Sequence, residues 1–211
     1  MDLNFLFKGL LFGFSIAAPV GPIGVLCIRR TLADGRMSGL LSGLGAASAD
    51  AIYGSIAAFG VAFISNFLIS QQFWIRLVGG LFLCYLGIKT MLAKPAETPA
   101  SADRKGLLGA YASTLFLTLT NPMTILSFAA IFSGLGLATS EGSFSSAGLM
   151  VLGVFGGSCT WWLLLSTLVS IFRKRFSLAG LKWINRISGA VIIAFGVYAL
   201  ISIFTSLTLA V

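Results

Sequence analysis

The sequence predicts an all-α integral membrane protein of six transmembrane helices, arranged as two inverted three-helix repeats with helices 1 and 4 broken at proline. Three observations lead to this prediction. Of 211 residues, 57% are hydrophobic and only 9% are charged, and the mean hydropathy is +1.00, unlike a soluble domain. Six apolar runs are long enough to cross a bilayer, which takes about 20 helical residues. Finally, a glycine and tryptophan pattern in the third run recurs in the sixth.

The six runs cover residues 5–28, 39–63, 73–92, 108–137, 147–172 and 187–207. The first run is longer than the apolar part of a signal peptide and lacks a small-residue cleavage site before Arg29, so we expect it to be retained. The polar stretch "KPAETPASADRK" predicts a flexible cytoplasmic linker. The chain therefore divides into a first three-helix repeat (1–93), a linker (94–107) and a second repeat (108–211).

Helices 1 and 4 each contain a break, at Pro19-Val20-Gly21-Pro22 and at Thr120-Asn121-Pro122. Unwound backbone at membrane depth must line a cavity or find protein partners. Pro22 and Pro122 suit the first position of a helix that starts inside the bilayer, where free N–H groups attract a carboxylate. A single proline more often marks a packing kink, but breaks in corresponding positions of two halves indicate a transporter's binding site.

The basic residues predict the orientation of the chain. Twelve of the 14 fall in the first, third and fifth loops, so the positive-inside rule makes these loops cytoplasmic and puts both termini outside. The same rule accounts for the basic run at residues 173–175, for which nucleic-acid binding is the alternative interpretation. We expect no nucleic-acid partner.

Helix 2 carries Asp50, about 20 Å along the helix from Arg36 and thus near the midplane. An ionisable residue at this depth indicates function by default. The alternative is a protonated acid that is hydrogen-bonded to Asn121 or Ser158 and has no part in transport. A carboxylate neutralised by either a proton or a substrate ammonium would couple transport to protons. Tyr53, one turn further on, is either a hydroxyl of the same site or a packing aromatic.

The internal repeat rests on three matches in chain order. The pattern W-I-x4-G-x6-G starts at Trp74 in helix 3 and again at Trp183 in helix 6, a shift of 109 residues. Helices 2 and 5 match less closely at a shift of 108, and helices 1 and 4 match at a shift of 100. Three helices per half would place the second half upside down relative to the first.

The match between helices 2 and 5 pairs Asp50 with Ser158. Ser158 and Trp161 are therefore candidate site residues from helix 5, with packing as an equal alternative. The glycines of both helices, such as Gly43 and Gly157, more simply predict close helix contacts.

Catalytic and metal chemistry find little support in the sequence. The chain contains no histidine, the commonest general base and metal ligand. Its three cysteines, Cys27, Cys84 and Cys159, have no paired or metal-type spacing. We expect no enzyme activity, no metal site and no cofactor.

At the residues described above, the chain resembles the LysE/RhtB family of bacterial amino-acid exporters. The matching signatures are "AAPVGP" at residues 17–22, "GLLSGLGAASADAIY" at 39–53 and "TNP" at 120–122. Many family members look like P-G-P where this chain has valine before Gly21. The resemblance implies export of amino acids or close derivatives across the bacterial inner membrane, driven by the proton-motive force.

Together these observations predict a secondary transporter with a central cavity between the two breaks. A zwitterionic substrate would place its carboxylate near Pro22 or Pro122 and its ammonium near Asp50, and a neutral amino acid fits one acidic residue better than a dication. Two alternatives stay open: a cation or metal exporter, and a membrane scaffold without transport. The sequence also leaves open whether the chain forms a homodimer. The predicted substrate-binding residues are Pro19, Gly21, Pro22, Asp50, Tyr53, Asn121, Pro122, Ser158 and Trp161.

Overall fold

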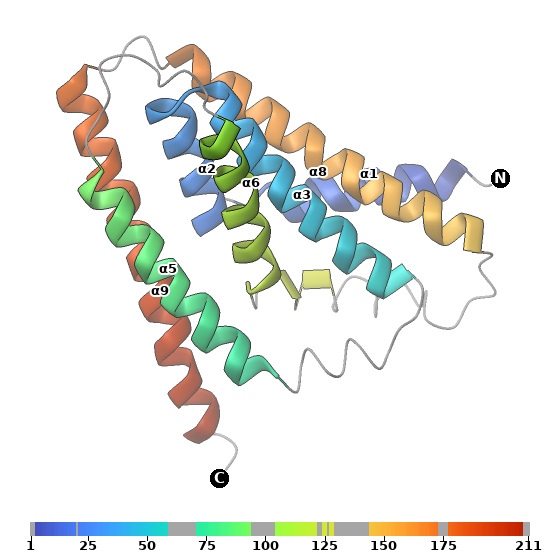
Figure 1. Cartoon of the computed structure of the whole chain (residues 1–211). Helices are drawn as coiled ribbons and strands as arrows, with labels where there is room; N and C mark the ends of the chain where they lie inside the picture. Colours follow the sequence, from blue (N-terminus) through green and yellow to red (C-terminus); the bar gives the residue numbers. More distant parts are fainter. Residues whose placement is uncertain are drawn as a thin grey trace.

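The computed structural model describes residues 3–19, 21–58, 71–93, 104–121, 124–125, 127–128, 144–172 and 177–208. Every regular element within these ranges is helical (Figure 1). By length and apolarity α5, α8 and α9 can each span a membrane, and α1 with α2 would make a fourth, bent span. The architecture therefore agrees with the predicted all-α membrane protein. The helices are α1 (Leu3–Ala17), α2 (Pro22–Ala33), α3 (Arg36–Ala58), α5 (Gln72–Leu92), α6 (Arg104–Leu119), α8 (Phe144–Phe172) and α9 (Leu178–Thr208).

The helices extend beyond several of the predicted apolar runs. The helix α9 begins at Leu178, ahead of the run at 187–207, and α6 begins at Arg104, inside the predicted linker. The predicted runs stop where charged residues begin, but charged residues are tolerated at the ends of transmembrane helices, so the helices can continue past the runs. The end of the second run after Ala58 and most of the fourth run after Asn121 lie outside the described residues.

The predicted break in helix 1 is confirmed. The helix α1 ends at Ala17 and α2 starts at Pro22, and their axes meet at 80°. Proline at position 19 disfavours helical geometry at Ala18, and Pro22 occupies the first turn of α2, where no donor is lost. The N-cap of α2 is Gly21, whose carbonyl accepts from the N–H of Val25 at 3.0 Å.

The chain is also broken after α6. This helix ends at Leu119, and Asn121 has no helical geometry. The carbonyl of Asn121 accepts from the backbone N–H groups of Thr124 and Ile125 at 3.1 and 3.3 Å, so a helical stretch restarts there. Pro122 itself, a predicted site residue, lies outside the described residues.

The helices pack in pairs, α1 on α8, α3 on α6, α3 on α8 and α5 on α9 (Figure 1). Between the α5–α9 pair and the other helices lies α2, which contacts both α3 and α9. Glycines allow the close approaches: a side chain at Gly13 of α1 would strike the backbone of Val154, and one at Gly45 of α3 the carbonyl of Tyr111. The predicted packing role is confirmed for Gly43, where a Cβ would strike the side chain of Trp162, and for Gly157, where it would strike the carbonyl of Leu10.

The α5–α9 contact joins glycines of the repeated pattern. A Cβ at Gly80 would lie 3.1 Å from the carbonyl oxygen of Gly196. A Cβ at Gly87 would lie 2.9 Å from the carbonyl oxygen of Gly189. The two antiparallel helices thus touch through two glycine pairs.

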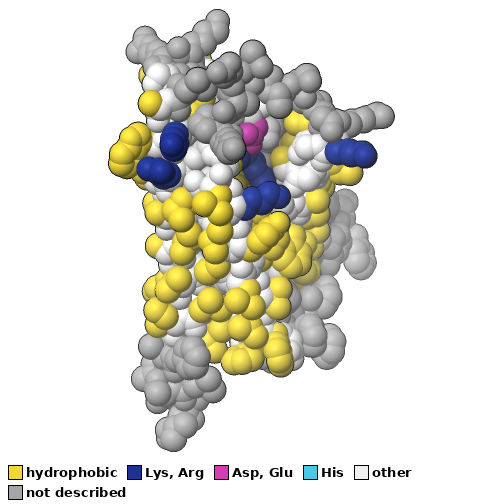
Figure 2. Space-filling model, turned by 60° about the vertical axis from the view of Figure 1, so that its left-hand side comes forward, with side chains coloured by type: hydrophobic (Ala, Val, Ile, Leu, Met, Phe, Trp, Pro, Cys, Tyr) yellow, Lys and Arg dark blue, Asp and Glu magenta, His cyan; other side chains and the backbone are white. Residues whose placement is uncertain are grey.

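Basic side chains gather toward one end of the molecule, which we call the basic end and which carries Arg29, Arg30, Lys89 and Lys105. On the flank shown in Figure 2, the Lys and Arg side chains lie above a broad band of hydrophobic ones. At this end Arg29 Nε donates to Asn185 Oδ1 at 2.9 Å, which ties α2 to α9.

Candidate functional site

A small central cavity of about 70 Å³ lies where the break between α1 and α2 faces α3, α8 and the end of α6. Five predicted site residues line it: Pro19, Gly21, Pro22, Asp50 and Asn121. The residues that flank the two breaks, far apart in the sequence, are therefore brought to one cavity. This volume is well below the roughly 300–1,000 Å³ of ordinary small-molecule pockets.

The carboxyl group of Asp50 is at the centre of this arrangement. Asp50 is only 3% exposed, and its Oδ2 accepts from Ser158 Oγ at 2.7 Å. This bond joins α3 to α8, and Ser158 is fully buried. The two residues paired by the sequence repeat are thus in direct contact. Asp50 lines the cavity, and Ser158 does not.

Tyr53 lies one turn from Asp50, but outside the lining of the cavity. Its Oη donates to the backbone carbonyl of Leu119 at 2.5 Å, and its ring lies against Phe128 with centroids 5.8 Å apart. Leu119 is the last residue of α6, so this carbonyl has no partner within its own helix. Tyr53 therefore holds the broken end of α6 against α3.

Of the two neighbouring tryptophans in α8, Trp162 lines the cavity and the predicted Trp161 does not. The ring of Trp161 packs edge-on against Phe14 of α1 instead. Trp162 is only 4% exposed, and its indole Nε1 has no hydrogen-bond partner in the part of the chain that the structure describes. A buried donor without a partner beside a cavity indicates a place for an acceptor. The sequence contains one signal for Trp162, its spacing of four residues from Ser158.

The first turn of α2 supplies further donors. Ile23 and Gly24 line the cavity immediately after Pro22. The first N–H groups of a helix have no acceptor within the helix, and the helix dipole favours negative charge beside them. The cavity therefore offers a carboxylate at one place and N–H donors at another.

Arg30 does not line the cavity but lies beyond it, toward the basic end. Its Nη1 donates to Ser42 Oγ, Thr114 Oγ1 and the carbonyl oxygen of Ala110, each at 2.9 Å. Its Nη2 donates to Ser113 Oγ at 2.8 Å. These bonds join α2 to α3 and α6. From the sequence, Arg30 is only one of the basic residues that predict membrane orientation. An arginine predicted to lie in a loop gives no sign that its side chain lies between helices.

No group of three or more His, Cys, Asp or Glu side chains that could hold a metal ion occurs among the described residues. Among the described residues that line the cavity, Asp50 is the one acidic residue. Its donors and its single carboxylate suit a small organic zwitterion better than a cation that requires six or more oxygen ligands.

Comparison with known proteins gives a consistent result. A family model described as LysE type translocator matches residues 14–203. The chain is 26% identical to YcgF of Bacillus subtilis (strain 168), which carries a provisional name as an amino acid efflux protein, over 93% of this chain and 95% of that protein. It is 30% identical to the uncharacterized membrane protein YahN of Escherichia coli (strain K12), over 86% of this chain and 81% of that protein. It is 24% identical to the threonine efflux protein of Escherichia coli (strain K12), over 96% and 100% of the two chains. No solved structure matches the chain.

Proposed function

The chain belongs to the LysE type translocator family, and from this premise we propose that it exports neutral amino acids from the cytoplasm in exchange for protons. The observation that carries the proposal is the central cavity, which is lined by Asp50, by the start of α2 and by Trp162, whose indole N–H has no partner among the described residues. Relatives named for amino acid and threonine efflux support the class of substrate and the direction.

The glycine contacts support the proposed inverted repeat. A shift of 109 residues carries Gly80 onto Gly189 and Gly87 onto Gly196. Gly80 contacts Gly196. If each residue is replaced by its counterpart in the other half, this contact becomes one between Gly189 and Gly87, which also occurs. This is the behaviour of a pair of helices related by a two-fold axis.

The remaining contacts follow the same rule. Exchanging the halves turns the pair α1–α8 into α6–α3, and both pairs are packed. Gly21 and Asn121, which correspond at a shift of 100, each accept from the N–H four residues later at the start of a helical stretch. Asp50 and Ser158 exchange places with each other, so their hydrogen bond lies on the proposed axis. These features support two three-helix halves of opposite orientation, at residues 1–93 and 108–211.

The cavity chemistry suits the two charges of a neutral amino acid. Its ammonium would pair with Asp50, which accepts only one hydrogen bond from the described residues. Its carboxylate would bind the N–H groups of Ile23 and Gly24 and the indole N–H of Trp162. A proton taken up by Asp50 would displace the ammonium, which gives exchange.

Substrate entry requires the helices to move. At about 70 Å³, the cavity is well below the roughly 300–1,000 Å³ of ordinary small-molecule pockets. The hydrogen bonds of Arg30, which join α2 to α3 and α6, lie between the cavity and the basic end. Opening that side would require Arg30 to release α3 and α6, consistent with alternating access between two halves. We place the basic end in the cytoplasm and the termini outside the bacterial inner membrane, by the distribution of basic loops.

Counterflow in proteoliposomes tests this function. Purified protein is reconstituted with an unlabelled amino acid inside, and the accumulation of each radiolabelled amino acid of a panel is measured with and without a pH gradient. We expect accumulation of at least one neutral amino acid, such as threonine, and its stimulation by the gradient. Absence of exchange for the whole panel, from protein that is monodisperse and thermally stable, would overturn the proposal.

Trp162→Phe removes the indole N–H and preserves most of the packing volume. We expect the KM for the transported amino acid to rise about tenfold, the equivalent of one hydrogen bond to a charged group, with a smaller change in the maximal rate. The measurement is the concentration dependence of initial counterflow rates.

Trp161→Phe is the matched control, because Trp161 lies on the same helix and does not line the cavity. Its KM should stay within about twofold of the native value, the range of a substitution away from the site, because its ring packs against Phe14. Equal effects of the two substitutions would contradict the assignment of Trp162.

A further inference from the structure

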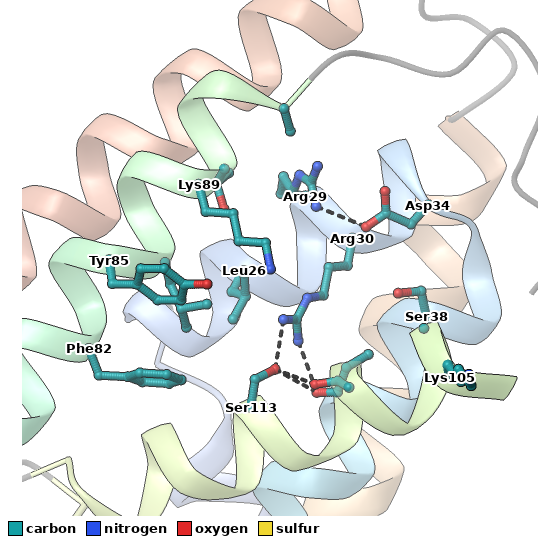
Figure 3. Close-up of a pocket in the computed structure, with 16 residues that line it drawn as sticks. Leu26, Arg29, Arg30, Asp34, Ser38, Phe82, Tyr85, Lys89, Lys105 and Ser113 are labelled. Atoms are coloured by element: carbon teal, nitrogen blue, oxygen red, sulfur yellow. Dashed lines mark hydrogen bonds and ion pairs between the residues drawn. The ribbon is translucent and has the colours of Figure 1, made fainter. Parts of the chain in front are cut away.

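A second, larger cavity of about 480 Å³ lies at the basic end, between α2, α5 and α6 (Figure 3). We call it the basic pocket. Toward the opposite end, α5 and α6 converge, and Gly79 lies close to the carbonyl of Thr120. The rings of Phe82 and Phe116 pack edge-on there, with their centroids 4.9 Å apart. From this closed end the two helices diverge toward Lys89 and Lys105, which leaves the pocket between them.

The pocket carries excess positive charge. Among the described residues that line it, Arg29, Arg30, Lys89 and Lys105 are basic and Asp34 alone is acidic. The carboxylate of Asp34 is paired with Arg29 Nη1 at 2.8 Å. Within the described part of the chain, Arg30, Lys89 and Lys105 form no ion pair. Figure 3 shows the Lys89 ammonium directed toward the guanidinium group of Arg30, whereas the guanidinium group of Arg29 is directed toward Asp34. Such an arrangement has charge complementarity to an anion with several oxygen atoms.

The wall contributed by α6 is bare. Gly106 and Gly109 both line the pocket, and a Cβ at either position would meet no atom within 4 Å. These glycines therefore leave the pocket unfilled, unlike Gly13 or Gly45, where a neighbouring backbone occupies the space.

The pocket also adjoins an apolar surface. Phe82 and Tyr85 of α5 line its inner end. The same helix exposes a stripe of apolar side chains at spacings of three and four residues, Val78, Leu81, Tyr85 and Ile88, which are 45 to 55% exposed. Figure 2 shows the basic side chains directly above the hydrophobic band on this flank. A ligand in the pocket can thus bind basic groups at one end and hydrocarbon at the other.

We propose that the basic pocket binds the phosphate headgroup of an anionic phospholipid, with the acyl chains along the exposed face of α5. Basic pockets between transmembrane helices at the level of the headgroups are suited to such lipids, and the volume is within the range of ligand pockets. The bound lipid would fill the space between α5 and α6 and contact α2 beside Arg30, the residue that joins α2 to α3 and α6. The proposal depends on membrane insertion and not on the identity of the transported substrate.

Native mass spectrometry of the detergent-purified full chain tests the proposal. Phosphatidylglycerol and phosphatidylcholine of equal chain length are titrated separately, and the first bound lipid is quantified. We expect phosphatidylglycerol to bind at least about tenfold more tightly, and the double variant Lys89→Gln/Lys105→Gln to weaken its binding about 30-fold, from the electrostatic contribution of two lysines. Gly109→Leu, which fills the pocket without changing charge, should weaken it to a similar extent.

Each variant has a matched control outside the pocket. Lys182→Gln/Arg186→Gln removes the same charge from α9, outside the pocket. Gly148→Leu adds the same side chain to α8, where a Cβ also meets no atom within 4 Å. Both controls should bind phosphatidylglycerol as the native protein does.

Three results would overturn the proposal. One is equal binding of the two lipids, and another is equal weakening by the pocket variants and their controls. The third is displacement of phosphatidylglycerol by inorganic phosphate or by the amino acids of the counterflow panel, which would make the pocket a site for soluble anions. Because lipid binding is measured without transport, a failed counterflow experiment leaves this test intact.

Discussion

Proton-driven exchange is expected to fall by about 100-fold or more when Asp50 is replaced by asparagine. Removing one partner of a buried charge pair costs about 2–5 kcal/mol, and tenfold corresponds to about 1.4 kcal/mol. The variant can neither pair with a substrate ammonium nor take up a proton, whereas its amide oxygen can still accept from Ser158. The fold should therefore survive while transport is lost. The measurement is counterflow in proteoliposomes with and without a pH gradient.

Asp34→Asn is the matched control, since it also converts a carboxylate to an amide. The side chain of Asp34 is 42% exposed and pairs with Arg29 away from the central cavity. We expect at least half of the native exchange rate to remain. Full gradient-stimulated exchange by Asp50→Asn would show that this acid has a structural role only, as a hydrogen-bond partner of Ser158.

The second large effect is expected on folding, from Gly13→Val. A Cβ at this position would overlap the backbone carbonyl of Val154, so α1 could not keep its distance from α8. Neither backbone can give way as a flexible side chain could, and overpacking of this kind costs about 3 kcal/mol or more. We expect loss of most monodisperse protein, measured by size-exclusion chromatography and thermal unfolding in detergent.

Gly148→Val separates this clash from the general effect of valine in a helix. Gly148 lies in α8, where an added Cβ meets no atom within 4 Å. Its yield and melting temperature should stay close to those of the native protein. If the two variants behave alike, the α1–α8 contact does not determine stability.

Local chemistry explains why the sequence predicts the breaks well. Proline at 19 and 22 acts on its immediate neighbours, so the end of α1 and the start of α2 follow from the residues themselves. The pairing of Asp50 with Ser158 can be predicted from the sequence for a different reason. The repeat aligns the two residues, and an acid within a predicted membrane span requires a partner. Both residues meet in the structure.

The remaining site residues depend on how helices rotate against one another. Trp161 and Trp162 are equivalent in composition, and only the packing of α8 on α1 and α3 decides that Trp162 faces the cavity. The basic pocket is formed by three helices that are distant in sequence, so its lysines and arginines give the same signal as ordinary cytoplasmic loop residues. The sequence offers one sign of the basic pocket: Gly106 and Gly109, which have no side chain, lie close to Lys105 on one helix.

The hydrogen bond between Asp50 and Ser158 has a consequence for how such a protein can arise. On the proposed two-fold relation, each residue occupies the place of the other, 2.7 Å apart. An antiparallel dimer of one three-helix unit would put two identical residues there: two aspartates would repel each other, and two serines would carry no charge. Joining both halves in one chain lets the two positions diverge. A single acidic group can then occupy the axis, equally distant from both faces of the membrane.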